Sequence, residues 1–433
     1  MSQRLNRRNF IYGSLGLGLA TCTAKPTWAA ASSEVQIGCI GVGGKGWSDM
    51  EETSAGNQIV AICDVDEERL AKAAEKFPKA KKYTDWRKLL EQTDVDAVTV
   101  SIPDHMHAPV TMSALSAGKH TYTQKPLAHS VFEARQLTLA AERHGAITQM
   151  GIQHHSNTFF KTAVQLVQGG TIGRVSDVHV WTDRPVGFWE QNKDRATSKP
   201  APDSLHWNNW LGVAPERPYA DGYHPFHWRA FWDFGTGALG DMGCHGMDPV
   251  ISALELGPPT SVTPTGPMPN NETGPAWSIL QYEFPGTKWT SKSLPMTWYD
   301  GAKLPPRDLF EIPNDQKILE NGILFIGDKG QLLVDYFNPP TLLPKGDFAD
   351  TKIVAAPIDN HYTQWTDAIK GNGKTSCPFS YSGPLTETVL LGNVAVRTGK
   401  AIKWDSKNMR CDMASANDLL RREYRDGWKV AGL

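Results

Sequence analysis

The chain has 433 residues, which suggests two or three domains at roughly 150 residues each and excludes a minidomain that depends on metal or disulfide staples. Its 40% hydrophobic and 21% charged residues are typical of a globular protein rather than a disordered or fibrous one. The net charge is only −2, and a basic cluster at the N-terminus accounts for several of the cations, so bulk charge does not favour nucleic-acid binding.

The first 31 residues have the pattern of an export signal. Arg7 and Arg8 precede a run rich in Gly, Leu and Ala, and small residues follow at positions 29–31. This pattern predicts a twin-arginine (Tat) signal peptide over residues 1–31, with the Tat export machinery as a partner and a periplasmic or otherwise exported location. Lipid attachment at Cys22 is an open alternative. The apolar run is too short to span a membrane, and we expect no span elsewhere.

Short apolar runs alternate with helical periods between residues 35 and 150. We predict strands at residues 35–40, 58–63, 96–102, 121–123 and 147–149, and helices at residues 67–77, 107–117 and 130–144. This alternation predicts an α/β fold, with a Rossmann-type doubly wound parallel sheet as the domain of residues 35–150.

The pattern changes after residue 151. A predicted helix at residues 158–167 is followed by Trp- and Pro-rich segments between longer strands at residues 175–182, 277–284 and 330–336. Residues 257–275 read as a loop, and helices at residues 385–398 and 414–424 are expected to pack back on the body. Residues 151–433 therefore predict an α+β domain with a large, mostly antiparallel open sheet, whose aromatic face we expect to join subunits into a homo-oligomer.

Neither the cysteines nor the histidines have the spacing of a metal site, so none is predicted. Cys39 and Cys63 fall in predicted adjacent strands and would be able to approach each other. Buried free thiols are the favoured interpretation.

A glycine-rich turn directly follows the first predicted strand and opens a helix. Its glycines, Gly41, Gly43, Gly44 and Gly46, would let backbone N–H groups approach a pyrophosphate. Asp64 ends the second strand about 20 residues later, where a carboxylate can bind the adenosine ribose and repel a 2'-phosphate. This favours NAD over NADP as cofactor; Asp66 is a rival for the ribose role.

Three further segments, together with the glycine turn, carry a resemblance to a known family. They are Ile102-Pro103-Asp104-His105, Gln124-Lys125-Pro126 and the sequence DMGCHGMD at residues 241–248. From about residue 35 to the C-terminus, the chain resembles the glucose-fructose oxidoreductase, inositol dehydrogenase and MocA (Gfo/Idh/MocA) family.

The resemblance implies that Lys125 and His245 flank the nicotinamide and the reacting hydroxyl, and that Asp241 touches the substrate or orients the histidine. A histidine suits the base that takes the hydroxyl proton, and a lysine can stabilise developing alkoxide charge. We expect Asp241 at the end of a strand. We also assign Pro103, His105 and Gln124 to the cofactor site. Gln124 departs from the family, which usually has Glu at this position. A neutral amide can still form hydrogen bonds but cannot supply charge.

Six tryptophans between residues 181 and 232 favour a carbohydrate, since indole faces stack on sugar rings, although we expect most of them to be core. Gln153, His155, Trp228 and Arg229 are candidate substrate contacts, together with Asp241 and His245.

The sequence thus predicts an exported NAD(P)-dependent oxidoreductase with tightly bound NAD that acts on a sugar, polyol or glycoside hydroxyl. An NAD-dependent glycoside hydrolase or lyase that works through a transient keto-sugar, without net redox change, is an alternative that the motifs do not separate. A non-catalytic sugar-binding protein is a second alternative.

Overall fold

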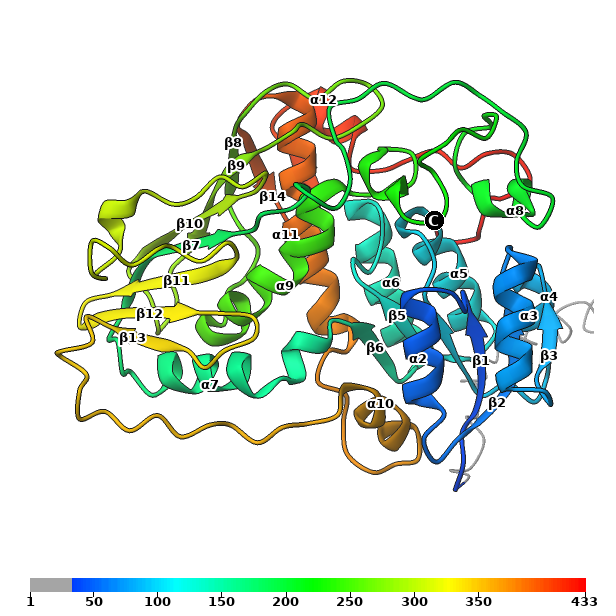
Figure 1. Ribbon diagram of the computed structural model, residues 1–433, viewed down its shortest axis with the longest axis horizontal. Coiled ribbons are helices and arrows are strands. Elements are labelled where there is room, and N and C mark those ends of the chain that lie inside the picture. Colours follow the sequence, from blue (N-terminus) through cyan, green and yellow to red (C-terminus); the bar gives the residue numbers. More distant parts are fainter. Residues whose placement is uncertain (1–32) are drawn as a thin grey trace, which may run out of the picture. The chain divides into compact units, whose positions relative to one another are not determined.

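An all-parallel sheet makes up the first part of residues 33–433, the part of the chain described by the computed structural model (Figure 1). Its six strands lie in the order β3-β2-β1-β4-β5-β6. They are β1 (Gln36–Ile40), β2 (Gln58–Cys63), β3 (Lys81–Tyr83), β4 (Ala97–Val100), β5 (His120–Gln124) and β6 (Thr148–Gly151). The helices between them are α2 (Lys45–Thr53), α3 (Glu67–Lys76), α4 (Trp86–Leu90), α5 (Asp104–Ser116) and α6 (Val131–His144).

The strand order reverses between β1 and β4, and this reversal places a crevice at the carboxyl edge of the sheet. The central strands are apolar and buried on both faces, as a sheet covered by helices on both sides requires. Helix α6 begins with a capping box, in which Ser130 and Glu133 satisfy each other's backbone N–H groups. These features confirm the predicted Rossmann-type sheet.

A second, nine-stranded sheet has the order β13-β12-β11-β7-β10-β9-β8-β14-β15. Its neighbours are antiparallel except for β7 and β10, so the predicted mostly antiparallel sheet is confirmed. The strands are β7 (Val175–Trp181), β8 (Ser261–Thr265), β9 (Ile279–Pro285), β10 (Ser293–Tyr299), β11 (Gly322–Gly327), β12 (Gly330–Val334), β13 (Thr341–Leu343), β14 (Ile402–Asp405) and β15 (Arg410–Cys411).

Three helices pack against one another and on this second sheet: α7 (Thr158–Gln168), α9 (Gly237–Leu254) and α11 (Phe379–Thr398) (Figure 1). A shorter helix, α10 (His361–Ile369), instead lies against α2 of the first sheet. The remaining short helices are α8 (Trp207–Leu211) and α12 (Ala414–Asp418).

Several elements differ from the sequence prediction. The supposed loop at residues 257–275 contains β8, which pairs with β9 and β14. Helix α12 ends at Asp418, and the chain then runs along α6, where Leu420 accepts a backbone hydrogen bond and the Tyr424 hydroxyl donates to Glu133 at 2.6 Å. The predicted packing of the tail on the body is therefore confirmed, but not through a longer helix. Helix α9 was not predicted at all, because its many glycines mask its helical period.

The aromatic side chains on the far face of the second sheet are covered by the chain itself. Trp181 and Tyr299 pack with Phe310 and Ile312 from the segment that follows β10. Oligomerisation through this sheet stays a prediction.

The predicted signal peptide, with Cys22, lies outside the described residues. Among the described helices, none is both long and apolar enough to cross a membrane. Cys39 and Cys63 are buried free thiols, as favoured from the sequence.

Candidate functional site

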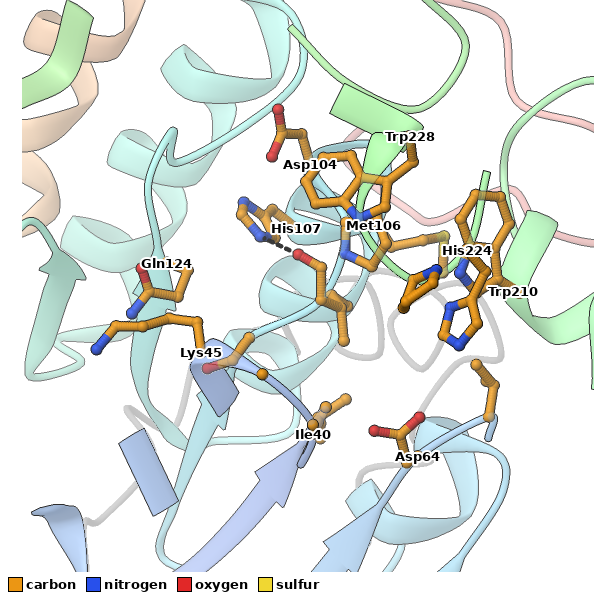
Figure 2. A pocket seen from close by; sticks show the side chains of 18 of the residues that line it. Ile40, Lys45, Asp64, Asp104, Met106, His107, Gln124, Trp210, His224 and Trp228 are labelled. Atoms are coloured by element: carbon orange, nitrogen blue, oxygen red, sulfur yellow. Dashed lines mark hydrogen bonds between the residues drawn. The ribbon is translucent and has the colours of Figure 1, made fainter. Parts of the chain in front are cut away.

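One cavity of about 480 Å³ runs along the carboxyl edge of the parallel sheet and is closed by residues that follow this sheet in the chain. Figure 2 shows Lys45 and Gln124 towards one end and Asp64 towards the other, below Trp210 and His224. The predicted site residues that line it are Gly41, Gly43, Gly44, Asp64, Pro103, Gln124, Lys125, Gln153, Trp228, Arg229, Asp241 and His245. The fold thus brings the residues of the cofactor motif and the predicted catalytic residues together in one cavity.

The glycine turn between β1 and α2 forms a cradle that side chains would fill. A Cβ on Gly41, whose φ is +80°, would lie 2.3 Å from the Ser101 carbonyl oxygen. Gly44 has a φ of +54°, and a Cβ there would meet open space. The first N–H groups of α2 follow this turn, where a helix N-terminus favours a phosphate. The residues present therefore fit a dinucleotide pyrophosphate.

Asp64 is the carboxylate that faces the cavity from the end of β2. It accepts hydrogen bonds from the backbone N–H of Val42 at 2.9 Å and of Asp66 at 3.0 Å. Burial raises the pKa of Asp64, although these two N–H groups oppose the rise. Asp66 does not line the cavity; it caps α3 through the Glu68 N–H. The geometry therefore favours Asp64 for the ribose role.

Residues 204–230, which we call the cover segment, close the Asp64 end of the cavity. Their backbone pairs with the turn after β2: His206 N–H donates to Val65 at 2.8 Å, and Ser204 accepts from Glu67 N–H at 2.9 Å. The His224 ring donates to Asp66 at 3.0 Å. Trp210 and His224, which sequence reasoning missed as site residues, line the cavity from this segment. Their position opposite Asp64 depends on tertiary contacts alone.

Lys125 and Asp241 form a largely buried ion pair at the other end. Lys125 Nζ lies 2.8 Å from Asp241 Oδ1, with the two side chains 15% and 17% exposed. Burial would raise the pKa of Asp241, but Lys125 and Arg229 beside it hold that pKa well below its usual range. Arg229 also stacks on Trp228, with the guanidinium carbon 4.3 Å from the ring centroid. This cluster fixes the lysine ammonium at the cavity wall.

Asp241 and His245 lie on α9, four residues apart, so they share a helix face. The expectation of a strand end for Asp241 was wrong. Burial, reinforced by Lys125 and the neighbouring His154, lowers the pKa of His245 well below its usual value. His245 Nδ1 has no hydrogen-bond partner among the described residues. A neutral imidazole is the form that can accept a proton.

Three predicted site residues do not line the cavity. His105 is fully buried, and its ring nitrogens face the carbonyl oxygens of Phe234 and Trp210 at 3.3 and 3.1 Å, so it anchors the cover segment. His155 pairs with Asp248 at 2.8 Å, about one turn beyond His245 along α9. Gly46 lies behind the turn, where a Cβ would come within 2.0 Å of the Gly41 carbonyl oxygen, so it permits helix packing rather than ligand contact.

The cavity also has cationic and acidic lining residues that sequence reasoning missed. Lys45 follows the glycine turn directly, and Asp104 opens α5. Their positions next to recognised motifs were the only available signal. Gln153, a predicted contact, lines the cavity and donates to the Tyr122 hydroxyl at 2.8 Å.

Two family models match the chain and together cover more than half of it. Residues 35–152 match an oxidoreductase family described as an NAD-binding Rossmann fold. Residues 156–286 match the C-terminal alpha/beta domain of the same oxidoreductase family.

Curated relatives match over shorter stretches. Inositol 2-dehydrogenase from Salmonella typhimurium is 27% identical over 150 residues, covering 34% of this chain and 45% of that protein. Alpha-N-acetylgalactosaminidase from Shewanella oneidensis is 37% identical over 120 residues, covering 25% and 26%. Levoglucosan dehydrogenase from Pseudarthrobacter phenanthrenivorans is 25% identical over 188 residues, covering 43% and 40%. The chain therefore spans less than half the length of each of these relatives.

Solved structures share the fold over most of the chain. The WlbA dehydrogenase from Bordetella pertussis, solved with NADH and UDP-GlcNAcA, has a TM-score of 0.60 at 16% identity and covers 86% of this chain and 99% of its own. A levoglucosan dehydrogenase solved with NADH and L-sorbose has a TM-score of 0.58 at 15% identity and covers 86% and 99%. With both family domains present in order, this chain belongs to the Gfo/Idh/MocA oxidoreductase family, and its first domain is that family's NAD-binding Rossmann fold.

Proposed function

We propose that this chain is an exported oxidoreductase that keeps NAD tightly bound and acts on a hydroxyl of a sugar, polyol or glycoside. The observation that carries the proposal is the single cavity that joins the glycine turn and Asp64 to Lys125, Asp241 and His245. The Arg7-Arg8 pair and the apolar run after it support export through the Tat machinery to the periplasm.

The NAD site would extend along the carboxyl edge of the sheet, from Asp64 at β2, past the glycine turn, to Gln124 at β5. Bound NAD supplies the acceptor for a hydride from a sugar carbon. The carboxylate of Asp64 favours NAD over NADP, because it would repel a 2'-phosphate.

The chain's own residues handle the proton. His245 is buried, and its lowered pKa keeps the imidazole neutral and able to accept the hydroxyl proton. Lys125 is fixed by Asp241, so its ammonium can hydrogen-bond the same oxygen as negative charge develops there. Trp228 and Arg229 wall the cavity nearby and suit a polyhydroxylated ring.

A glycosidase that oxidises and re-reduces its sugar is the second candidate. Oxidation to a ketone acidifies the neighbouring C–H bond, elimination expels the leaving group, water adds to the alkene, and reduction restores the hydroxyl. Two observations favour it: the similarity to an alpha-N-acetylgalactosaminidase and the cover segment, which would keep the nucleotide in place between the two redox steps.

One experiment distinguishes the candidates. The purified protein is denatured in part to look for released NAD, and the rest is given free sugars and aryl glycosides without added nucleotide. A keto-sugar or sugar acid supports the oxidoreductase, whereas release of the aryl group with turnover and no oxidised product supports the glycosidase. A chain that contains no dinucleotide and takes up none would refute both.

A further inference from the structure

A buried carboxylate, Asp49 on α2, lies directly behind the Gln124 end of the cavity. Its side chain is 0% exposed. Oδ2 accepts from the Ser101 hydroxyl and from Gln124 Nε2, both at 2.7 Å. Oδ1 lies 3.0 Å from Lys45 Nζ and accepts from the Tyr362 hydroxyl at 3.1 Å. Four donors from separate parts of the fold thus converge on one acceptor, the environment of a carboxylate anion.

Asp49 determines which end of the Gln124 amide faces the cavity. Because an ionised carboxylate only accepts hydrogen bonds, the amide must present its NH₂ group to Asp49 and leave its oxygen for the cavity side. Gly151 provides the space, since a Cβ there would lie 2.5 Å from Gln124 Nε2. An ionised glutamate at position 124 could not make this hydrogen bond to Asp49, because a carboxylate has no proton to donate.

Asp49 also balances the charge of Lys45, which lines the cavity next to Gln124 (Figure 2). Burial would lower the pKa of Lys45, but Asp49 and the Tyr362 hydroxyl raise it on balance, so the ammonium stays charged. The cavity wall at this end therefore holds two lysines, Lys45 and Lys125, and each has one acidic partner.

This end of the cavity is where the nicotinamide of a bound dinucleotide would lie, because Asp64 and the glycine turn occupy the β2 and β1 positions and Gln124 follows at β5. The oxidised nicotinamide ring is a cation, whereas the reduced ring is neutral. An unbalanced ammonium at this end would disfavour the oxidised form.

We propose that Asp49 is a positioning residue that sets the balance between bound NAD⁺ and bound NADH: it neutralises Lys45 and orients Gln124 at the nicotinamide end. It supplies the negative charge that the neutral Gln124 does not. The inference rests on the proposed NAD-dependent function and concerns the relative, not the absolute, affinity for the two nucleotides.

The test is a competition that requires no substrate. The full chain, freed of bound nucleotide, is incubated with equal concentrations of NAD⁺ and NADH and desalted, and the two nucleotides released by denaturation are quantified. Asp49→Asn keeps the size of the side chain but removes its charge. We expect the bound NAD⁺/NADH ratio to fall about tenfold, the effect of losing one adjacent opposite charge.

A charge exchange provides the sharper comparison. In Asp49→Asn combined with Gln124→Glu, the amide and the carboxylate change places within the same hydrogen-bonded pair. The bound NAD⁺/NADH ratio should then return to within about threefold of the parent value, so that more than half of the tenfold loss, on a logarithmic scale, is recovered. Gln124→Glu alone places two carboxylates together, which would share a proton at low pH, so its preference for NAD⁺ should rise with pH. This single variant tests the inference even if Asp49→Asn does not fold.

Glu387→Gln is the matched control. Glu387 is a buried carboxylate paired with Arg135, and neither residue lines the cavity. This variant should be destabilised in a thermal melt and should keep the parent nucleotide ratio.

The inference is overturned if folded Asp49→Asn binds the two nucleotides in the parent ratio, or if the exchanged pair is no better than Asp49→Asn. It is also overturned if the ratio of Gln124→Glu does not change with pH. If the parent chain binds neither nucleotide, the proposed function fails instead.

Discussion

Replacement of His224 by alanine should loosen the cover segment and speed the release of NAD. The His224 ring donates to Asp66 at 3.0 Å, with the two side chains only 13% and 12% exposed. A hydrogen bond to a charged group contributes about 1.5–3 kcal/mol when water is largely excluded. At about 1.4 kcal/mol per factor of ten, the release rate should rise roughly 10- to 150-fold. Helix α3 should survive, because Asp66 keeps its capping bond to the Glu68 N–H.

The assay follows the loss of labelled NAD after rapid dilution into excess unlabelled NAD, which refills each vacated site and so prevents a vacated chain from unfolding. His206→Ala is the matched control, because His206 makes a similar bond to Glu67 from the same segment. That pair is 39% and 60% exposed, so it contributes only about 0–1 kcal/mol. If His224→Ala releases nucleotide no faster than His206→Ala, the cover segment is not what retains it.

Three further predictions concern catalysis, the turn and pH. Lys125→Ala and His245→Ala should each abolish turnover and keep bound NAD; normal rates in either variant would remove its assigned role. Gly46→Ala should lose nucleotide binding and melt at a lower temperature, because its Cβ would lie 2.0 Å from a loop carbonyl oxygen. Burial opposes charge on His155, but its carboxylate partner raises the pKa of His155 well above its usual value. The pair should therefore stabilise the fold fully below pH ~6.5 and lose this effect as pH rises through the raised pKa. The melting temperatures of the parent and of His155→Gln, measured from below pH ~6.5 to above the raised pKa, should converge at high pH.

Local patterns were sufficient for most of the first domain. Residues 58–63 were predicted as a strand and form β2 without any change of bounds, because an apolar run between polar turns has few other solutions. The short β3 was missed, since Lys81 and Lys82 carry no apolar signal and the strand exists only through pairing with β2. Helix α11 begins earlier than predicted, because Pro384 interrupts the pattern although the helix accommodates it.

The predicted site residues divide in the same way. Gly41, Gly43 and Asp64 were identified because a pyrophosphate and a ribose impose fixed spacings on a strand, a turn and the next strand. His105 and His155 do not line the cavity. His105 was assigned from a motif and His155 from the path of the chain after the sixth strand, and neither signal tells whether a side chain faces a ligand or a neighbouring segment.

The sequence alone determined the strand and helix alternation, the glycine turn, the acidic end of β2 and the lysine and histidine motifs, since each of these depends on residues close together in the chain. Only the tertiary structure decided that Asp241 holds Lys125, that residues 204–230 cover the Asp64 end, and that Asp49 also gathers Gln124 and Tyr362. Tyr362 and Asp49 are separated by 313 residues. Contacts over such separations follow from how the two sheets pack, and no local period in the sequence encodes them.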